Sequence, residues 1–510
     1  MLMGIFILYQ QLGTVAIDEL LELAKACPDK EALYAAGCCM LVGFGAKAGA
    51  FPLHIWLPKA HPVAPAPASA LLSGILTKTG VFGMLLLTGN LFLHDTKWGS
   101  LILLLGVFTM FGGALLALFS IDLKRTLACS SMSQIGFIMV GMGMQGLLGD
   151  ENALAVHGTM LHMVNHSMIK LVLFMAAGVI FMNTHALNLN EIRGFGRKKP
   201  LLKAIFLAGA LAIGGIPMFG GYISKTLIHE SIVEFGTDWV MHLVEYVFLF
   251  SGGLTVAYMT KLFVAIFVEK NENAEVQRKF DKQTRYMNRE SGAALTVSAV
   301  LLVIWGLFPH SIMDRAAELG QGLMHLEETG HAVAYFSMKN MSGALISIVI
   351  GAVVYLFVVR KLLMRKSGRH VEYVNCWPQW LDVEELIYRP LLLKLLPLIG
   401  GIFCRVFDSC LDIMVVALRK TIYSDSPIPH ELLEGNSITL ALGKICNFVQ
   451  YVGNKTTRRK NPAAVDYVHR FAVSYDKYRA SRTIIGRSMS FALLLFCIGF
   501  CLTMIYMLLW

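Results

Sequence analysis

Long apolar segments separated by short polar loops dominate the hydropathy pattern of the chain. A helix needs roughly 20 apolar residues to cross a bilayer, and most of these segments are that long or longer. The pattern therefore predicts an all-α, polytopic membrane protein with about ten transmembrane helices. The predicted spans cover approximately residues 32–57, 66–93, 98–120, 127–147, 152–183, 201–234, 240–268, 292–310, 342–363 and 488–509.

Two of the spans, 32–57 and 201–234, are unusually long and carry glycine and proline in their interior. Helices of this kind are often interrupted in the membrane, where protein or a water-filled cavity must cover the freed backbone groups. We therefore expect two discontinuous helices at corresponding positions of two structural repeats, as in transporters with inverted repeats.

The segments outside the main block of spans are more polar. Residues 1–11 are apolar but too short to span, and an acidic stretch follows them. Residues 364–487 are too polar to span, yet acids, bases and leucines recur in them at helical spacing. Composition leaves two interpretations of this segment open, a small cytoplasmic helical domain or an amphipathic helix along the membrane surface.

These features predict five parts along the chain. The main one is an ion-translocating transmembrane domain, and the segment that follows its last helix lies on the cytoplasmic side. The parts are a partial helix with an outward-facing loop at 1–31, the transmembrane domain at 32–340, a transmembrane helix at 341–363, an amphipathic helical segment at 364–487 and a terminal anchor helix at 488–510.

Charge agrees with a membrane protein and sets its orientation. Charged residues make up only 15% of the chain and apolar residues 56%, whereas soluble domains carry about 25% charged residues. The net charge of +10 comes from loops on one side of the predicted membrane. By the positive-inside rule that side is cytoplasmic, and nucleic acid is not an expected partner.

Motifs for catalysis or cofactors are missing from the sequence. The ten cysteines form no CxxC pair, and there is no P-loop, GxGxxG or HExxH motif. Zinc and iron–sulfur sites need such ligand spacings, and no residue set suits covalent catalysis. We therefore expect no catalytic residue, metal or cofactor in this chain.

Lysines inside the spans are the first candidates for function. A lysine at the centre of the bilayer costs at least roughly 2.5–3.5 kcal/mol, so such residues usually serve transport. Lys47 and Lys225 lie at the interruptions of the two long spans, and Lys78 lies in the middle of another. The alternative for Lys47 is a side chain that reaches to the interface.

Two histidines and a further lysine form a second set of candidates. His162, His166 and Lys170 are spaced i, i+4 and i+8, which places them on one helix face. Imidazoles titrate near neutral pH, so such a row passes protons along itself with the help of water. Alternatives are a zinc site, although no carboxylate or cysteine joins the pair, and histidines with a purely structural role.

Acidic groups near the second interruption complete the list. Glu230 and Glu234 follow Lys225 by one to two helical turns and are candidates for exit-side groups. Glu245 and Lys261 in the next span are weaker candidates.

Four motifs, in this order along the chain, resemble the antiporter-like subunits of respiratory complex I. The same family includes Mrp-type sodium/proton antiporters and the membrane arms of energy-converting hydrogenases and formate hydrogenlyases. The resemblance covers about residues 1–270, and the tail after 364 is similar in architecture to the lateral helix and anchor of the largest, distal subunit. The motifs are GAKAGAFPLHIWLPKAHPVAPAPASALLSGILTKTG at 45–80, KRTLACSSMSQIGF at 124–137, HMVNHSMIKLVLFMAAG at 162–178 and LAIGGIPMFGGYISK at 211–225.

The resemblance implies a role for each candidate. Lys47 corresponds to the central proton carrier of the first half-channel and Lys78 to the connecting lysine on the next helix. His162, His166 and Lys170 correspond to the link between the half-channels, and Lys225 to the terminal carrier.

The chain departs from the family at its start. The family has about five to six further helices upstream, one of them with a glutamate that pairs with the lysine at position 47. The first of the two inverted repeats is therefore incomplete here. The missing helices come from another polypeptide, from an upstream start, or from the remainder of a longer chain.

The sequence thus predicts a proton-translocating subunit, with possible sodium coupling, of a redox-driven complex similar to NADH-quinone oxidoreductase or a hydrogenase. Its partners are other membrane subunits, which carry any iron–sulfur cluster, flavin or nickel, and the expected location is a bacterial plasma membrane. One alternative is a subunit of a stand-alone sodium/proton antiporter. A second is a structural anchor without transport, which the costly lysines disfavour.

Overall fold

The computed structural model describes most of the chain, and its residues form two compact units, Met1–Glu384 and Glu385–Trp510. The predicted anchor at 488–510 lies outside the described residues, except for Phe496, Phe500 and Met504. The described residues are 1–236, 238–326, 333–367, 370–421, 435–457, 465–479, 496, 500 and 504.

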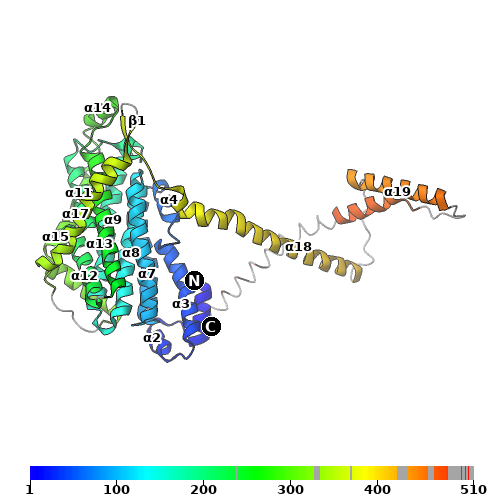
Figure 1. Cartoon of the computed structure of the whole chain (residues 1–510), viewed down its shortest axis with the longest axis horizontal. Coiled ribbons are helices and arrows are strands. Elements are labelled where there is room, and N and C mark those ends of the chain that lie inside the picture. The colour runs from blue at the N-terminus through cyan, green and yellow to red at the C-terminus, as the bar shows by residue number, and fades with distance from the viewer. Residues whose placement is uncertain are drawn as a thin grey trace. The chain divides into compact units, whose positions relative to one another are not determined.

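The first unit is helical almost throughout, as the hydropathy pattern predicts (Figure 1). Its helices are α1 (Leu2–Leu12), α2 (Ile17–Ala26), α3 (Lys30–Ala48), α4 (Trp56–Val63), α5 (Ala66–Leu71), η1 (Leu72–Leu76), α6 (Thr77–Asn90), α7 (Thr96–Phe119), α8 (Leu123–Leu148), η2 (Gly149–Glu151), α9 (Ala153–Thr184), α10 (Leu189–Ile192), α11 (Pro200–Gly214), α12 (Gly220–Phe235), α13 (Trp239–Phe267), α14 (Ala274–Lys282), α15 (Arg289–Leu307), η3 (Pro309–Met313), α16 (Asp314–Gln321), η4 (Gly322–Met324), α17 (Met338–Val354), η5 (Tyr355–Leu363) and η6 (Gln379–Leu381), while η7 (Glu384–Tyr388) begins at its last residue.

Eight helical stretches among the described residues are long and apolar enough to cross a membrane. Seven of them fall within the first unit and match predicted spans. The eighth, Glu384–Cys410, lies within 364–487, which the sequence predicts to be too polar to span as a whole. The position of this segment relative to the membrane stays a prediction.

Both predicted interruptions are present. Helix α3 ends at Ala48 and α11 ends at Gly214, and each is followed by a glycine in the left-handed conformation, Gly49 with φ 79° and Gly215 with φ 73°. Only glycine adopts this conformation without strain, so it ends a helix sharply. The chain then continues as α4 in the first case and as α12 in the second.

Helices α7 and α8 form the most extensive helix–helix contact in the unit, and glycines allow their close approach. A Cβ atom added at Gly136 would lie 2.1 Å from the backbone nitrogen of Met110, and one added at Gly143 would lie 2.6 Å from that of Leu103. Helices in membranes associate through small residues in this way. As a result α8 is buried along nearly its whole length, in the centre of the unit.

A short β-hairpin, β1 (Met364–Ser367) and β2 (His370–Tyr373), follows the last helix of the block, where the sequence predicted only helix. The side chain of Asn190 forms two hydrogen bonds with the backbone of β2, as a neighbouring strand would. Its side-chain oxygen accepts from the backbone nitrogen of Tyr373 at 2.8 Å, and its amide donates to the carbonyl of the same residue at 3.0 Å.

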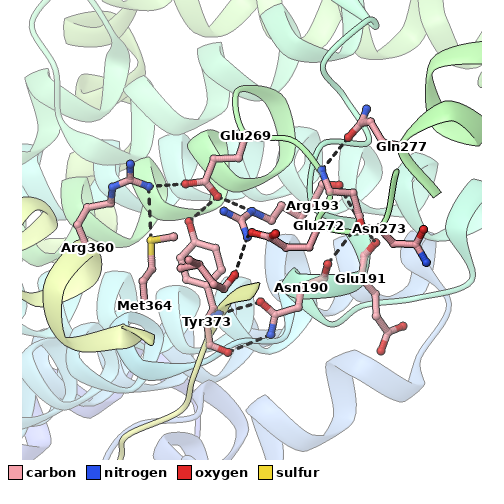
Figure 2. Close-up of polar contacts among 12 residues, drawn as sticks. Asn190, Glu191, Arg193, Glu269, Glu272, Asn273, Gln277, Arg360, Met364 and Tyr373 are labelled. Atoms are coloured by element: carbon pink, nitrogen blue, oxygen red, sulfur yellow. Dashed lines mark hydrogen bonds and ion pairs between the residues drawn. The ribbon is translucent and has the colours of Figure 1, made fainter. Parts of the chain in front are cut away.

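Charged side chains fasten the hairpin to the loops beside it, in a cluster that we call the polar clasp (Figure 2). Arg193 donates from Nε to Glu269 at 2.7 Å, and from a terminal nitrogen to Glu272 at 3.0 Å and to the Val371 carbonyl at 2.7 Å. The Tyr373 hydroxyl donates to Glu269 at 3.1 Å, and Arg360 also pairs with this carboxylate. Burial and the Glu269 charge raise the pKa of Tyr373, which keeps it a donor.

The described residues of the second unit, which begins within η7, form mainly helices. They are η8 (Leu391–Leu395), α18 (Leu396–Thr421), α19 (Ser437–Thr457) and a helix over 467–479. Asn447 on α19 donates to Asp466 at 2.9 Å and accepts from the backbone nitrogen of Tyr467 at 2.8 Å, which ties α19 to the start of the following helix.

The α7–α8 contact predicts different effects on stability for alanine substitutions of two glycines, Gly136 within the contact and Gly112 beside it. Gly136→Ala should lower the free energy of unfolding by about 1–3 kcal/mol, because the new methyl group meets the backbone of Met110. Gly112→Ala is the matched control, since its Cβ would meet only Met132 Cε at 3.9 Å. Thermal unfolding in detergent measures both, and equal shifts would contradict this packing.

The polar clasp predicts that Arg193→Ala is strongly destabilising. The Arg193 and Glu269 side chains are only 8% and 11% exposed, and removal of one partner of a buried ion pair costs roughly 3 kcal/mol or more. Lys25→Ala is the control, because Lys25 and Glu22 form an ion pair that is 60% and 79% exposed and such pairs contribute about 0–1 kcal/mol. Thermal unfolding measures both variants. Equal unfolding temperatures for Arg193→Ala and Lys25→Ala would contradict a stabilising role of the polar clasp.

Candidate functional site

The centre of α9 brings the predicted histidines and lysine into the interior. His162 and His166 are each 1% exposed and Lys170 is fully buried. Their spacing of one helical turn places them on one face of α9, as the sequence predicts. Unpaired polar groups are costly in such a place, so their partners define the site.

Lys78 joins this face from α6. Its Nζ lies 2.7 Å from Nδ1 of His166 and donates to the carbonyl of Ser73 at 2.8 Å. Ser73 lies in η1, a π-helical turn whose wider winding alters the backbone hydrogen bonds just before Lys78. When the amine is charged it donates to His166 Nδ1, which leaves the imidazole proton on Nε2.

His162 connects α9 to α12. Its Nδ1 lies 2.9 Å from the Ser224 hydroxyl, and its Nε2 lies 3.1 Å from the side-chain oxygen of Gln134 on α8. Ser224 directly precedes Lys225 in α12. The described structure therefore aligns Lys78, His166, His162, Ser224 and Lys225, which we call the polar row.

The side chain of Lys225 extends from α12 to the end of α11, at the second interruption. Its Nζ donates to the carbonyl of Ile213 at 2.8 Å, in the last turn of α11, and lies 4.7 Å from the centre of the Phe137 ring. A carbonyl at a helix C-terminus carries partial negative charge, and the aromatic face attracts a cation as well. The interruption thus supplies a binding place for a buried amine.

A small cavity lies beside Lys225 and leads to His229. It offers about 30 Å³ to the centres of water molecules, and Tyr222, Thr226 and His229 are among its lining residues. A buried water needs about 10–15 Å³ by this measure and two to four polar partners, so the cavity has room for about two waters. Lys225 and His229 are spaced i, i+4 and lie on the same face of α12.

A chain of ion pairs continues from His229 to the end of the helices. His229 Nε2 lies 3.2 Å from a carboxylate oxygen of Glu245 on α13, and His242 Nδ1 lies 3.6 Å from the other oxygen. The His242 side chain is 50% exposed, which brings this path to the surface. Glu230 pairs with Lys339 at 3.0 Å beside it.

Lys170 lies one turn beyond His166 on the same face of α9, at the side of the polar row. Its Nζ donates at 2.8 Å to the carbonyl of Leu127 and at 2.8 Å to the Ser130 hydroxyl, which also accepts from Tyr258 at 3.0 Å. Several buried polar atoms near the row lack a protein partner among the described residues, where they are available to water. These atoms are Ser133 Oγ, Gln134 Nε2, Asn165 Oδ1 and His166 Nε2.

The structure thus places five of the six predicted relay residues together and the sixth apart. Lys47, in the last turn of α3, is exposed and makes no hydrogen bond or ion pair with any described residue. Of the acidic candidates, Glu230 pairs with Lys339 and Glu245 contacts His229, whereas Glu234 is exposed and has no ion pair in the described part.

Two further assignments differ from the sequence predictions. Lys261 is a cap, because its Nζ donates to three carbonyls at the end of α7, those of Ala117, Leu118 and Ser120. His229 did not stand out in the sequence, although its spacing from Lys225 is the one signal that marks it. Among the described residues no cluster of histidine, cysteine or acidic side chains has the geometry of a metal site.

A family model for the transmembrane part of NADH:quinone oxidoreductases and Mrp antiporters matches residues 1–251. These residues, just under half of the chain, are similar to this antiporter family. The chain is an integral membrane protein.

The curated relatives of the chain include a hydrogenase component and a quinone oxidoreductase chain. Hydrogenase-4 component B of Escherichia coli is 36% identical over 239 residues, which cover 44% of this chain and 36% of the relative. An NAD(P)H-quinone oxidoreductase chain 4 of Picosynechococcus is 33% identical over 273 residues, which cover 53% and 49%. This chain therefore spans less than half the length of either relative.

Solved structures share the fold of the antiporter family with this chain. The Mrp complex of a Dietzia species contains a chain that superposes with a TM-score of 0.55 at 20% identity, covering 69% of this chain and 67% of that one. A chain of an archaeal membrane-bound sulfane sulfur reductase gives a TM-score of 0.54 at 23% identity, with coverages of 63% and 62%.

Proposed function

We propose that this chain moves protons across the membrane as one subunit of a larger membrane complex. The observation that carries the proposal is the polar row, in which buried amines and imidazoles connect α6, α9 and α12 by hydrogen bonds. Ionisable residues are rare at membrane depth and mark ion pathways. The relatives named as a hydrogenase component and a quinone oxidoreductase chain support this assignment.

The row works as a relay because each imidazole has two nitrogens. His162 takes up a proton at one nitrogen and releases the other proton toward Ser224, and His166 does the same between Lys78 and the interior. The row holds only basic groups, so several cations at once repel one another. A proton that arrives at one end therefore favours release at the other.

The outward path starts at Lys225. Waters in the adjacent cavity connect its amine with His229, whose ring bonds the Glu245 carboxylate. Proton uptake takes place from the opposite, basic side, by way of Lys170 and Lys78. In this orientation the segment 364–487 faces the cytoplasm of a bacterial plasma membrane.

Lys47 belongs to a half-channel that this part of the chain does not complete. An exposed lysine at membrane depth needs a carboxylate partner, because a lone ammonium group costs several kcal/mol in lipid. We assign that carboxylate to a transmembrane helix on a neighbouring polypeptide or on an upstream portion of the same protein. Residues 32–340 form the translocating domain, and 341–363 is a flanking membrane helix.

The energy source resides in partner subunits. The candidate residues of this chain move protons and carry out no redox step, so iron–sulfur clusters, flavin or nickel belong to the partners. The second candidate is a stand-alone sodium/proton antiporter, which the family description favours because it includes Mrp antiporters.

Substitution of the relay lysines should stop proton pumping without loss of the fold. In membrane vesicles we expect Lys78→Ala, Lys225→Ala and the neutral, polar Lys225→Gln each to lower pumping by at least tenfold, about 1.4 kcal/mol of barrier or more. The exposed Lys279→Ala serves as the control and should pump normally. Assembly is checked on native gels, and normal pumping by both Lys78→Ala and Lys225→Ala would refute the relay.

Purification in a gentle detergent should bring down the partner subunits. Mass spectrometry that identifies subunits with iron–sulfur, flavin or nickel motifs would confirm a redox-driven pump. Small hydrophobic subunits alone would favour the antiporter instead. A photo-crosslinker at position 47 should capture a transmembrane peptide with an acidic residue, and capture of lipid only would overturn the assignment for Lys47.

A further inference from the structure

A second cavity of the first unit lies away from the polar row and has no role in the relay. It offers about 470 Å³ to the centres of water molecules, far more than a few waters need. Its walls come from residues 51–59, from the end of α7, from the start of α8 and from the segment 375–384. We propose that this cavity binds the headgroup of a zwitterionic phospholipid of the ethanolamine type.

The position of the cavity is that of lipid headgroups. Helix α7 ends at Phe119 and α8 begins at Leu123, so the cavity lies where two membrane helices meet the membrane surface. The loop between them is followed by Lys124 and Arg125, on the basic side of the protein. Headgroups of one leaflet occupy this level.

Charged groups of both signs line the cavity. Arg125 on α8 is exposed, and its guanidinium makes no hydrogen bond or ion pair with any described side chain. A guanidinium binds phosphate in a two-pronged geometry, which makes Arg125 the phosphate-binding group. Asp382 on the opposite segment of the chain supplies a carboxylate for an ammonium group.

The remaining charges in the wall are already balanced. Lys59 forms an ion pair with Glu384, which fastens the segment 375–384 to α4. Trp377 packs against Phe119 with ring centres 5.5 Å apart and strengthens the same wall. Two cations and two anions therefore surround the cavity, a balance that suits a zwitterion better than an anionic lipid.

An apolar stripe continues from the cavity along α7. Gly112, Leu116 and Phe119 line the cavity at helical spacing. Leu104 and Phe108, two turns and one turn before Gly112, extend the stripe toward the membrane centre and are 55% and 52% exposed. Phe51 of the cavity wall stacks on Phe108 at 5.8 Å, so cavity and stripe are continuous.

This continuity is what favours a phospholipid over other occupants. A free phosphate would use Arg125 but not the stripe, and a bare acyl chain would use the stripe but not the charges. A transmembrane helix of a partner would cover the stripe but would leave the charged cavity at its end unfilled, unless it carried charges of its own.

The test uses the whole complex with the full chain, extracted in mild detergent and stripped of lipid. Native mass spectrometry then measures retention of dioleoyl phosphatidylethanolamine, with dioleoyl phosphatidylglycerol as the anionic comparison. We expect preferential retention of the ethanolamine lipid and about tenfold weaker retention in Arg125→Gln, the loss expected for one charge-assisted hydrogen bond. Arg285→Gln, an exposed arginine outside the cavity, is the matched control.

A second variant fills the cavity from its apolar side. Gly112→Phe projects a ring into the space, since a Cβ there would meet only Met132 Cε at 3.9 Å, and should also release the lipid while the complex stays assembled. Equal retention by wild type and both variants would overturn the proposal. So would competition by soluble phosphoethanolamine as strong as that of the lipid, or capture of a peptide instead of lipid by a photo-crosslinker at Leu116.

Discussion

The bilayer offers no hydrogen-bond partners, and this constraint governs where the charged groups of the protein lie. Six lysines are buried in the described part of the chain, and every one of them donates to a backbone carbonyl. Carbonyls are available only where a helix ends, is interrupted or changes its winding, or where a side chain shares them. The irregular backbone and the buried amines therefore depend on each other.

Hydrogen bonds from buried lysines to backbone carbonyls serve two purposes. The other partners of each lysine show which purpose it serves. Lys261 bonds only to carbonyls at the end of α7, and Lys199 bonds only to those of Phe195 and Phe280. These amines cap helices and loops and have nowhere to pass a proton. Lys78 shares its amine with an imidazole, and Lys225 faces a cavity with room for water. Lys170 likewise shares its amine with the Ser130 hydroxyl, so these three lysines differ from the caps in having a partner other than a backbone carbonyl.

The sequence was sufficient to predict features that depend on local composition. Spans, interruptions and the face of α9 follow from hydropathy, glycine and proline positions, and helical spacing, and the structure contains all three. The hydrogen bond between Lys78 and His166 and the pairing of His229 with Glu245 join different helices, so no spacing within one helix reveals them. The hairpin at 364–373 depends in the same way on Asn190, more than 170 residues earlier in the chain.

The two helix interruptions differ in the groups that surround their lysines. This difference sets Lys47 apart from Lys225. At the second interruption Lys225 reaches the Ile213 carbonyl, with Phe137 of α8 against its amine. At the first, Trp56 donates to the carbonyl of Ala46 at 2.7 Å, so the backbone is satisfied without Lys47. Lys47 then faces outward from an apolar helix, where lipid would impose a penalty that the local fold does nothing to offset. The proposal that another helix covers this surface rests on that exposure.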